Sequence, residues 1–432
     1  MTKTNTAKLT NMKTFKQRFL AGLSLFLPGI FLLGFNIGTG SVTSMAKAGA
    51  DYGMSLLWTI VISCLCTFFM INLYGRYTLI TGETALHAFR THIHPTLGLF
   101  FIITLTAGVC GSVMGVMGIV AEISSEWSKS IFDEGIPPIY FSIVFISLVY
   151  YIFWNGNTQF FERSAAVIVA VMAICFIANF FIMMPPPIDI FRGLMPSIPG
   201  VLEDSNKSAF LVIASMVGTT VFSGLFIIRT TLVKEAGWTL IDYKKQRNDA
   251  IVSVCLMFVI SASIMAASAA SLHTEGLVLS KASQMITLLE PLAGSLAVSI
   301  FAIGLIAAGV SSQLPNVLML PWLICDYTNT DRDMSLLKFR LMVLGISLLG
   351  LVVPIFDARP VLVMIVSQAL NSLILPITVA SIFYLTNKKS LMNGYENTWL
   401  TNSVLIIIFI FSLFTTYIGI NGVKQTISNI LL

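Results

Sequence analysis

Two stretches of glycine and hydroxyl side chains interrupt long apolar segments of this 432-residue sequence. The first contains Asn36, Gly38, Thr39, Gly40 and Ser41, and the second contains Gly218, Thr219, Phe222, Ser223 and Gly224. Each glycine inside a helix costs about 1 kcal/mol relative to alanine, so both stretches are predicted to be unwound. Inside a bilayer, unwound backbone is tolerated only where it faces protein, water or a ligand, because lipid leaves its N–H and C=O groups unsatisfied. We therefore expect these residues to bind a substrate.

The positions of the two stretches match an internal repeat. The second lies in the sixth apolar segment, five segments after the first, as two inverted five-helix repeats of a secondary transporter require. The N-terminus of a half-helix carries about half a positive charge and free N–H groups, which suit a small anion such as a carboxylate. Phe222 would close such a pocket against an apolar group. Close packing of small residues, with Phe222 as an ordinary core residue, is the alternative.

Three further polar residues fall within apolar segments, where such groups usually line cavities or pair with each other. Glu122 would serve proton coupling, unless its helix end already reaches the outer interface. Arg229 lies about one and a half turns past the second stretch, where it would form a structural or gating ion pair, contact a substrate anion, or snorkel toward the cytoplasm. Gln368, with Asn371 and Ser312, would face the same cavity or hydrogen-bond between helices.

Motifs for catalysis or metal binding do not occur in the sequence. It has no HExxH, GxSxG or P-loop pattern and no cluster of His, Asp and Glu in an apolar segment, so we expect neither an enzyme nor a cofactor. The six cysteines lie in apolar segments without ligand spacing and are predicted to be packing residues. A channel would show rings of polar pore-lining residues, whereas two broken helices in one chain favour alternating access.

The elements that must position these residues are membrane-spanning helices. Hydrophobic residues make up 56% of the chain and charged residues 10%, with a mean hydropathy of +0.88, which excludes a water-soluble domain of this size. A spanning helix needs roughly 20 mostly apolar residues, and we count about eleven such segments. They run over approximately residues 22–46, 54–74, 97–124, 138–155, 164–184, 209–233, 250–271, 296–325, 337–355, 360–385 and 399–420. Because the segments lack an alternating pattern, a membrane β-barrel is not expected.

Charge distribution predicts the orientation of the chain. Residues 1–18 hold five basic residues and no acidic one, which places this tail in the cytoplasm. The even-numbered connections are also basic, and the odd-numbered ones are richer in acids, so an odd number of spans puts the carboxyl terminus outside. We expect a multi-pass protein of the cytoplasmic (inner) membrane, with a small molecule or an ion as its substrate. Nucleic acid is not an expected partner, because no dense basic stripe occurs.

No long linker divides the chain, so we predict a single transporter domain over residues 19–432, for which a monomer suffices. Repeat one covers about residues 22–184, repeat two covers about 209–385, and one extra helix covers about 399–420. The predicted fold class is therefore an all-α integral membrane protein with two inverted five-helix repeats, in which helices 1 and 6 are broken.

Several runs outside the breaks resemble one known family. Residues 48–53 (Ala-Gly-Ala-Asp-Tyr-Gly) with Leu56-Leu57-Trp58, residues 307–312 (Ala-Ala-Gly-Val-Ser-Ser), and residues 367–376 with 387–392 are similar to parts of helices 1, 2, 8 and 10 in the natural resistance-associated macrophage protein (Nramp) family. Members of this family are proton-coupled divalent metal transporters with the two-repeat fold that amino-acid transporters also use. The resemblance implies this fold for most of the chain.

The metal-binding motifs of the family are altered in this sequence. The family's Asp-Pro-Gly-Asn of helix 1 aligns with Gly38 to Ser41, and its Met-Pro-His of helix 6 aligns with Phe222 to Gly224. The first member of the family's acid pair in helix 3 is Ile119, Glu122 matches the second, and a second histidine of helix 6 falls at Arg229.

A divalent transition ion needs anionic or soft ligands to offset its dehydration, and this aligned set offers none. We therefore expect an Nramp-like secondary transporter for a small organic or amino acid. The alternatives are a divalent metal transporter for manganese, iron or magnesium with non-standard ligands, and a channel or receptor on the same fold.

Overall fold

The structure is a computed structural model that describes residues 38–129, 135–156, 174, 176–178, 180–181, 184–199, 209–289 and 295–431. Every regular element in this part of the chain is helical, which confirms the predicted all-α class. The first half contains α3 (Thr39–Tyr52), α4 (Leu57–Thr81), α5 (Ala85–Ala88) with the π-helical turn η1 (Phe89–Ile93), α6 (Pro95–Lys129), α7 (Pro138–Trp154) and α9 (Pro187–Gly193).

The second half begins with the two short helices α10 (Phe210–Thr220) and α11 (Ser223–Glu235). It continues with η3 (Leu240–Asp242), α12 (Tyr243–Ser268), η4 (Ala269–His273), η5 (Ala282–Leu289), α14 (Ser295–Thr328), α15 (Leu337–Leu348), η6 (Leu349–Leu351), α16 (Val352–Phe356), α17 (Pro360–Ser372), α18 (Leu375–Asn387), α19 (Lys389–Met392) and α20 (Trp399–Leu431).

Eight helical segments of the described chain are long and apolar enough to cross a bilayer. They are Leu57–Thr81, Pro95–Lys129, Phe210–Glu235, Leu240–His273, Ala302–Thr328, Leu337–Phe356, Pro360–Asn387 and Trp399–Asn429, and the apolar helix Pro138–Trp154 is shorter. Each overlaps one predicted span. The predicted spans at 22–46 and 164–184 lie largely outside the described residues, as does the predicted tail at 1–18.

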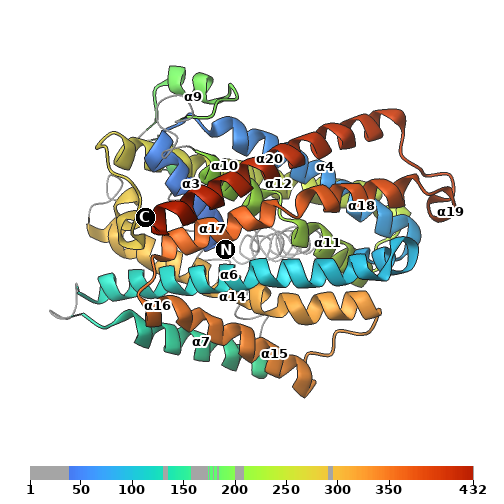
Figure 1. Cartoon of the computed structure of the whole chain (residues 1–432), viewed down its shortest axis with the longest axis horizontal. Coiled ribbons are helices and arrows are strands. Elements are labelled where there is room, and N and C mark those ends of the chain that lie inside the picture. Colours follow the sequence, from blue (N-terminus) through green and yellow to red (C-terminus); the bar gives the residue numbers. More distant parts are fainter. Residues whose placement is uncertain are drawn as a thin grey trace, which may run out of the picture.

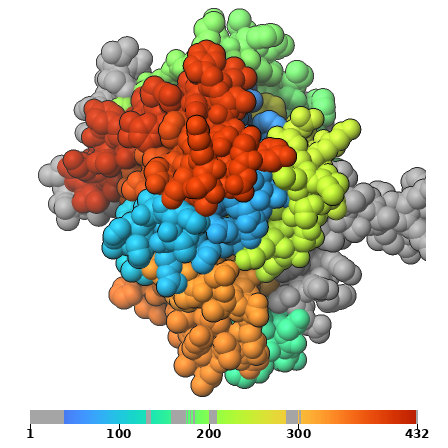
Figure 2. All heavy atoms as spheres, turned by 90° about the vertical axis from the view of Figure 1, so that its right-hand side faces the viewer, coloured from blue at the N-terminus to red at the C-terminus, as the bar shows by residue number. Residues whose placement is uncertain are grey.

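The long helices lie along a common direction, with α6 and α14 between α7 and α15 on one side and α17 and α20 on the other (Figure 1). Four connections gather at one end of the molecule, which Figure 2 shows face-on: those between α4 and α6, α11 and α12, α14 and α15, and α18 and α20. We call this end the α5 face. The connection between α12 and α14, which contains η5, lies at the opposite end, the η5 face (Figure 1).

The sixth predicted span is broken, as expected, but over fewer residues. Gly218 to Thr220 complete α10, and Ser223 and Gly224 already belong to α11, so only Val221 and Phe222 are non-helical. In the first predicted span, Thr39, Gly40 and Ser41 form the first turn of α3. The prediction that these three residues are unwound is therefore wrong: the glycine cost of about 1 kcal/mol is small beside the tertiary packing of a buried helix.

Candidate functional site

A cavity of about 40 Å³ lies at the break between α10 and α11 and beside the first turn of α3. Residues from five helices and from the break itself line it: Gly38, Gly40, Ser41, Val109, Ser112, Val116, Thr219, Phe222, Ser312, Asn316, Gln368 and Asn371. Since one water molecule needs about 10–15 Å³ of such space, the cavity has room for roughly three waters. No charged side chain is among the lining residues.

Neighbouring helices satisfy the backbone that the break exposes. The Val221 N–H donates to the Val217 carbonyl over 2.7 Å, and Thr67 of α4 donates its hydroxyl to the Thr220 carbonyl, also over 2.7 Å. On the α11 side, Thr378 of α18 donates to the Ser223 hydroxyl over 2.8 Å. Thr67 of α4 therefore satisfies a backbone carbonyl at the break, as irregular backbone within a bilayer requires, and Thr378 of α18 binds the side chain of the first residue of α11.

Glycine brings the helices around the cavity into close contact. A Cβ atom at Gly218 would lie 1.8 Å from the Gln368 carbonyl oxygen, so the backbones of α10 and α17 touch there. A Cβ atom at Gly40 would lie 2.5 Å from Nε2 of Gln368, which places the start of α3 against the same glutamine. Both glycines serve this approach, which partly confirms the packing explanation given above for small residues.

Hydrogen bonds join α6 and α17 along one wall of the cavity. Nε2 of Gln368 donates to the Ser112 hydroxyl over 3.2 Å, and Nδ2 of Asn371 donates to Oε1 of Gln368 over 3.2 Å. Gln368 thus lines the cavity and also bonds between helices, so the two predicted roles coexist. Oδ1 of Asn371 and Oγ1 of Thr39 are buried and have no hydrogen-bond partner in the part of the chain that the structure describes.

The predicted binding residues separate into three groups. Gly38, Gly40, Ser41, Thr219, Phe222 and Gln368 line the cavity. Thr39, Gly218, Ser223 and Gly224 are buried nearby without lining it, since Ser223 faces Thr378 and a Cβ at Gly224 would meet the Phe222 ring at 2.6 Å. Asn36 lies outside the described residues.

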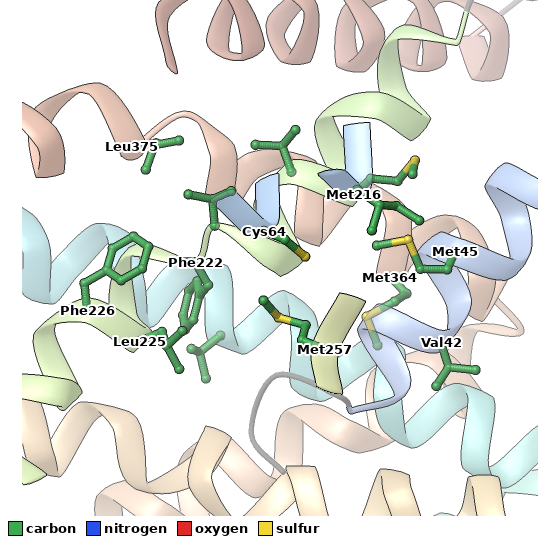
Figure 3. Close-up of a cluster of buried hydrophobic side chains, with 14 of the residues drawn as sticks. Val42, Met45, Cys64, Met216, Phe222, Leu225, Phe226, Met257, Met364 and Leu375 are labelled. Atoms are coloured by element: carbon green, nitrogen blue, oxygen red, sulfur yellow. The ribbon is translucent and has the colours of Figure 1, made fainter. Parts of the chain in front are cut away.

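Phe222 is the apolar element of the cavity wall. Figure 3 shows it at the break, with Leu225 and Phe226 on the α11 side and Met45 and Met364 farther along on the α3 and α17 side. Its side chain is buried and packs in the hydrophobic core. Phe222 therefore has both roles that the sequence left open, as a core residue and as a boundary of the cavity.

Two polar lining residues, Ser112 and Asn316, and the apolar Val109 and Val116 were not predicted from the sequence. Ser112 lies on α6 among Gly108, Gly111 and Gly115, a series that marks the face of α6 packed against α17. Asn316 follows Pro315 inside the apolar helix α14. A polar residue beside a proline or among glycines within an apolar segment is the signal that identifies both.

Glu122 lies near the η5 face and does not line the cavity. Its Oε1 accepts the backbone N–H of Ser283 in η5 over 3.3 Å. Proton coupling and a helix end at the outer interface both stay predictions for Glu122.

Arg229 forms the predicted ion pair. Its Nη1 donates to Oδ2 of Asp249 on α12 over 2.6 Å, and neither side chain is exposed. Nη2 donates to the Gln246 carbonyl over 3.4 Å, and the guanidinium lies 5.6 Å from the centre of the Trp238 ring. Arg229 does not line the cavity, so the structural role that we expected fits its surroundings.

Comparison with known proteins gives the family. The family model described as natural resistance-associated macrophage protein-like matches residues 30–421. The chain belongs to the Nramp family. This confirms the resemblance found in the sequence.

Nramp relatives include the divalent metal cation transporter MntH of Bradyrhizobium diazoefficiens, which is 21% identical over 88% of this chain and 86% of its own length. MntH of Chromohalobacter salexigens is 20% identical over 94% of both chains. MntH of Clostridium acetobutylicum is 25% identical, but the match spans 52% of this chain and 53% of that protein.

Solved structures confirm the two-repeat transporter fold. The manganese transporter of Eremococcus coleocola in complex with a bis-isothiourea compound superimposes with a TM-score of 0.69 at 16% identity, over 95% of this chain and 91% of that one. The inward-facing transporter Mhp1 superimposes with a TM-score of 0.58 at 13% identity, over 93% and 91% of the two chains. This Nramp chain therefore has the fold of secondary transporters that work by alternating access.

Proposed function

We propose that this Nramp protein transports a hard divalent cation, magnesium or manganese, across the cell membrane by alternating access. The observation that carries the proposal is the cavity at the helix break, which is lined by oxygen-bearing side chains and has space for roughly three waters. The relatives named above are divalent metal cation transporters, so we favour the metal alternative over the organic or amino acid that the sequence suggested.

The ligands would be neutral oxygens. The side chains of Ser41, Ser312, Asn316, Gln368 and Asn371 supply hydroxyl and amide oxygens to the cavity. Such oxygens, together with water, suit magnesium and manganese, whereas thiolate, thioether and imidazole ligands suit softer ions. Oδ1 of Asn371 lacks a hydrogen-bond partner within the described chain and packs against Gly108 of α6.

A neutral site has consequences for affinity. Without a carboxylate, the protein does not offset the full dehydration of a divalent ion, so the cargo would keep several of its waters. We therefore expect weaker binding than a site with acidic ligands would give, and little discrimination between magnesium and manganese. Cadmium, which prefers sulfur ligands, should bind poorly.

A small carboxylate is the second candidate cargo, and one observation favours it. Gly38, which precedes α3, makes no side-chain cap, and the first turn of α3 contains no acidic residue. Gly38, Gly40 and Ser41 all line the cavity, so the partial positive charge of this helix start faces it. This charge would attract an anion and oppose a cation.

Uptake into proteoliposomes separates the two candidates. We expect purified protein to take up magnesium and manganese when they are offered at millimolar concentrations. We expect no uptake of labelled alanine or lactate. Asn371→Leu should lower metal uptake about tenfold, since it removes the unpaired oxygen of a residue that lines the cavity. Asn421→Leu is the matched control, because Asn421 bonds only to the Tyr417 carbonyl of its own helix and lies outside the cavity. Uptake of a carboxylate in place of metal, reduced by Asn371→Leu, would contradict the cation proposal.

The remaining expectations concern orientation and coupling. We propose that the α5 face is cytoplasmic, because it collects the basic even-numbered connections, and that a monomer suffices for transport. Glu122 stays our candidate for proton coupling. Its test is metal uptake with an imposed pH gradient, which Glu122→Gln should make independent of that gradient if the assignment holds.

A further inference from the structure

Two connections hold together helices from different parts of the fold, one at each end of the molecule. On the α5 face, α5 joins α4 to α6. On the η5 face, the segment Thr274–Leu289 follows η4 and belongs to the connection between α12 and α14, of which residues 290–294 lie outside the described chain. In two inverted repeats, these connections are equivalent, since each one links the second helix of its repeat to the third.

The connection on the α5 face is bound to α11 and α14. The Ala85 N–H donates to Oγ1 of Thr230 on α11 over 2.9 Å. The N–H groups of Leu86 and His87 donate to Oδ2 and Oδ1 of Asp326 on α14, each over 3.3 Å. Both acceptors are buried, with Thr230 at 0% and Asp326 at 6% exposure. The Asp326 carboxylate thus satisfies the free N–H groups at the start of α5, an arrangement that also suits the helix dipole.

The connection on the η5 face is bound to the equivalent helices of the first repeat. Nζ of Lys47 on α3 donates to the Leu279 carbonyl over 2.7 Å, and the Ser283 N–H donates to Oε1 of Glu122 on α6 over 3.3 Å. Lys47 is the ninth residue of α3 and Thr230 is the eighth residue of α11, so the anchors match between the repeats. Glu122 and Asp326 are each an acid on the third helix of a repeat, half-buried and buried respectively, but they lie seven and two residues before the ends of their helices.

We propose that Asp326 is a gate-positioning residue: it holds α5 across the ends of α11 and α14 and so closes the α5 face, and its bonds to Leu86 and His87 break when that face opens. This proposal rests on the alternating-access function proposed above. Alternating access requires a closed arrangement at each end of the molecule in turn. A carboxylate that binds two backbone N–H groups is a suitable latch, because charge-assisted bonds are strong and yet reversible.

Other bonds strengthen the closed arrangement at the same place. Nζ of Lys234, at the end of α11, donates to Oδ1 of Asn329 just after α14 over 3.1 Å. Nε of Arg332 donates to Oε1 of Glu235 over 2.6 Å. These side chains are partly exposed, so each contributes little by itself. The buried Asp326 is therefore the member of this group whose loss we expect to have the largest effect.

Met319 lies on α14 between Asn316, which lines the cavity, and Asp326. Met319 is one turn beyond Asn316, is fully buried, and would lie 2.7 Å from a Cβ atom at Gly224. A cysteine at this position should be reachable from the α5 face only when α11 and α14 separate. Its reaction with an impermeant thiol reagent therefore reports opening of this face without any knowledge of the cargo.

The test uses the full chain with its native cysteines replaced and Met319→Cys introduced, in sealed vesicles with the reagent on the side of the α5 face. We expect Asp326→Ala to raise the labelling rate about tenfold, and Asp326→Asn to raise it less, because the amide oxygen still accepts one N–H group. Asp333→Ala is the matched control. Asp333 is an exposed acid of the connection between α14 and α15 on the same face, and hydrogen bonds from Ser335 lower the pKa of its carboxyl group, so it is charged at neutral pH.

A cysteine pair between α5 and α11 tests the same proposal without changing Asp326, in case Asp326→Ala disturbs folding. In Ala85→Cys/Thr230→Cys, a disulfide should fix α5 to α11 and suppress labelling of residue 319 until reductant is added. A cysteine pair at Asn387 and Asn402, which hydrogen-bond between α18 and α20, should leave labelling unchanged. Equal labelling rates for Asp326→Ala and the parent protein, or unchanged labelling after the Ala85–Thr230 disulfide forms, would overturn the proposal. Because no cargo is involved, either result is independent of the uptake experiment.

Discussion

Two regions along the helix α11 differ in whether their buried polar groups are charged and paired. At its first residues lies the cavity, which no charged side chain lines and where Oδ1 of Asn371 is unpaired within the described chain. Six residues after Ser223, Arg229 and Asp249 form an ion pair from which solvent is fully excluded. At the ion pair a charge is matched by an opposite charge, whereas in the cavity the unpaired oxygen belongs to a neutral group.

This contrast predicts which substitutions should change the stability of the protein and which should change substrate binding. A buried charge without its partner costs several kcal/mol, so the ion pair has to be complete in the folded protein. A neutral amide oxygen without a partner costs about 1–3 kcal/mol, which a folded protein tolerates, and a ligand recovers that energy when it binds. We therefore expect substitutions at the ion pair to reduce folding, and substitutions at the cavity to reduce uptake.

The largest expected effect is at the ion pair. Asp249→Leu leaves the Arg229 guanidinium buried without its carboxylate, and should lower the free energy of unfolding by about 3–5 kcal/mol. Unfolding by SDS in mixed micelles measures the change. The double variant Arg229→Met/Asp249→Leu removes both charges and should recover most of the loss, as paired apolar replacements often do. A double variant as unstable as the single one would show that the two residues do not act as a pair.

The next effect is at the contact between α10 and α17. In Gly218→Ala, the added methyl group meets the Gln368 backbone carbonyl, so one helix must move, and we expect a loss of about 1–3 kcal/mol in the free energy of unfolding. Gly345→Ala on α15 is the control, since no atom lies within 4 Å of the added methyl group, and it should be neutral or slightly stabilising. Equal stability of the two variants would argue against close backbone contact at Gly218.

A smaller effect is expected where α4 supports the break. Thr67→Val keeps the shape of the side chain but removes the hydroxyl that binds the Thr220 carbonyl, so it should cost about 1–2 kcal/mol in the free energy of unfolding. Ser403→Ala on α20 is a control, because its hydroxyl bonds only to the Trp399 carbonyl one turn earlier. A loss of uptake without a loss of stability would place Thr67 in the binding region.

Sequence patterns predicted the contrast only in part. Gly218, Phe222 and Gln368 were recognisable because polar or small residues interrupt apolar segments, and Arg229 because a charge within such a segment needs a partner. The partner, Asp249, was not identified, since it follows the basic residues that we assigned to a connection, whereas the helical span already begins at Leu240. Asp326 was also missed. It directly follows the predicted span 296–325, and acids are common at the ends of spans.

The unwinding of Thr39 to Ser41 was predicted wrongly because the local cost of glycine was weighed without the tertiary contacts that offset it. The partner of a buried charge and the limits of a break depend on contacts between residues far apart in the sequence. For Arg229 and Asp249, these contacts join two different helices. Periodicity within one segment carries no information about such pairs.

The smallest expected change in stability gives the sharpest comparison of the two regions. Gly40→Ala and Gly75→Ala each place a methyl group against the amide end of a glutamine, at 2.5 Å from Gln368 and 2.2 Å from Gln246. A flexible side chain yields, and alanine favours the helix over glycine, so each variant should lose less than about 1 kcal/mol in the free energy of unfolding. Gln368 lines the cavity, whereas Gln246 supports the ion pair through its carbonyl. Gly40→Ala should therefore reduce metal uptake per folded protein several-fold, and Gly75→Ala should leave it unchanged. If the two variants reduce uptake equally, then the ion-pair region also takes part in transport, and the separation between folding and binding along α11 does not hold.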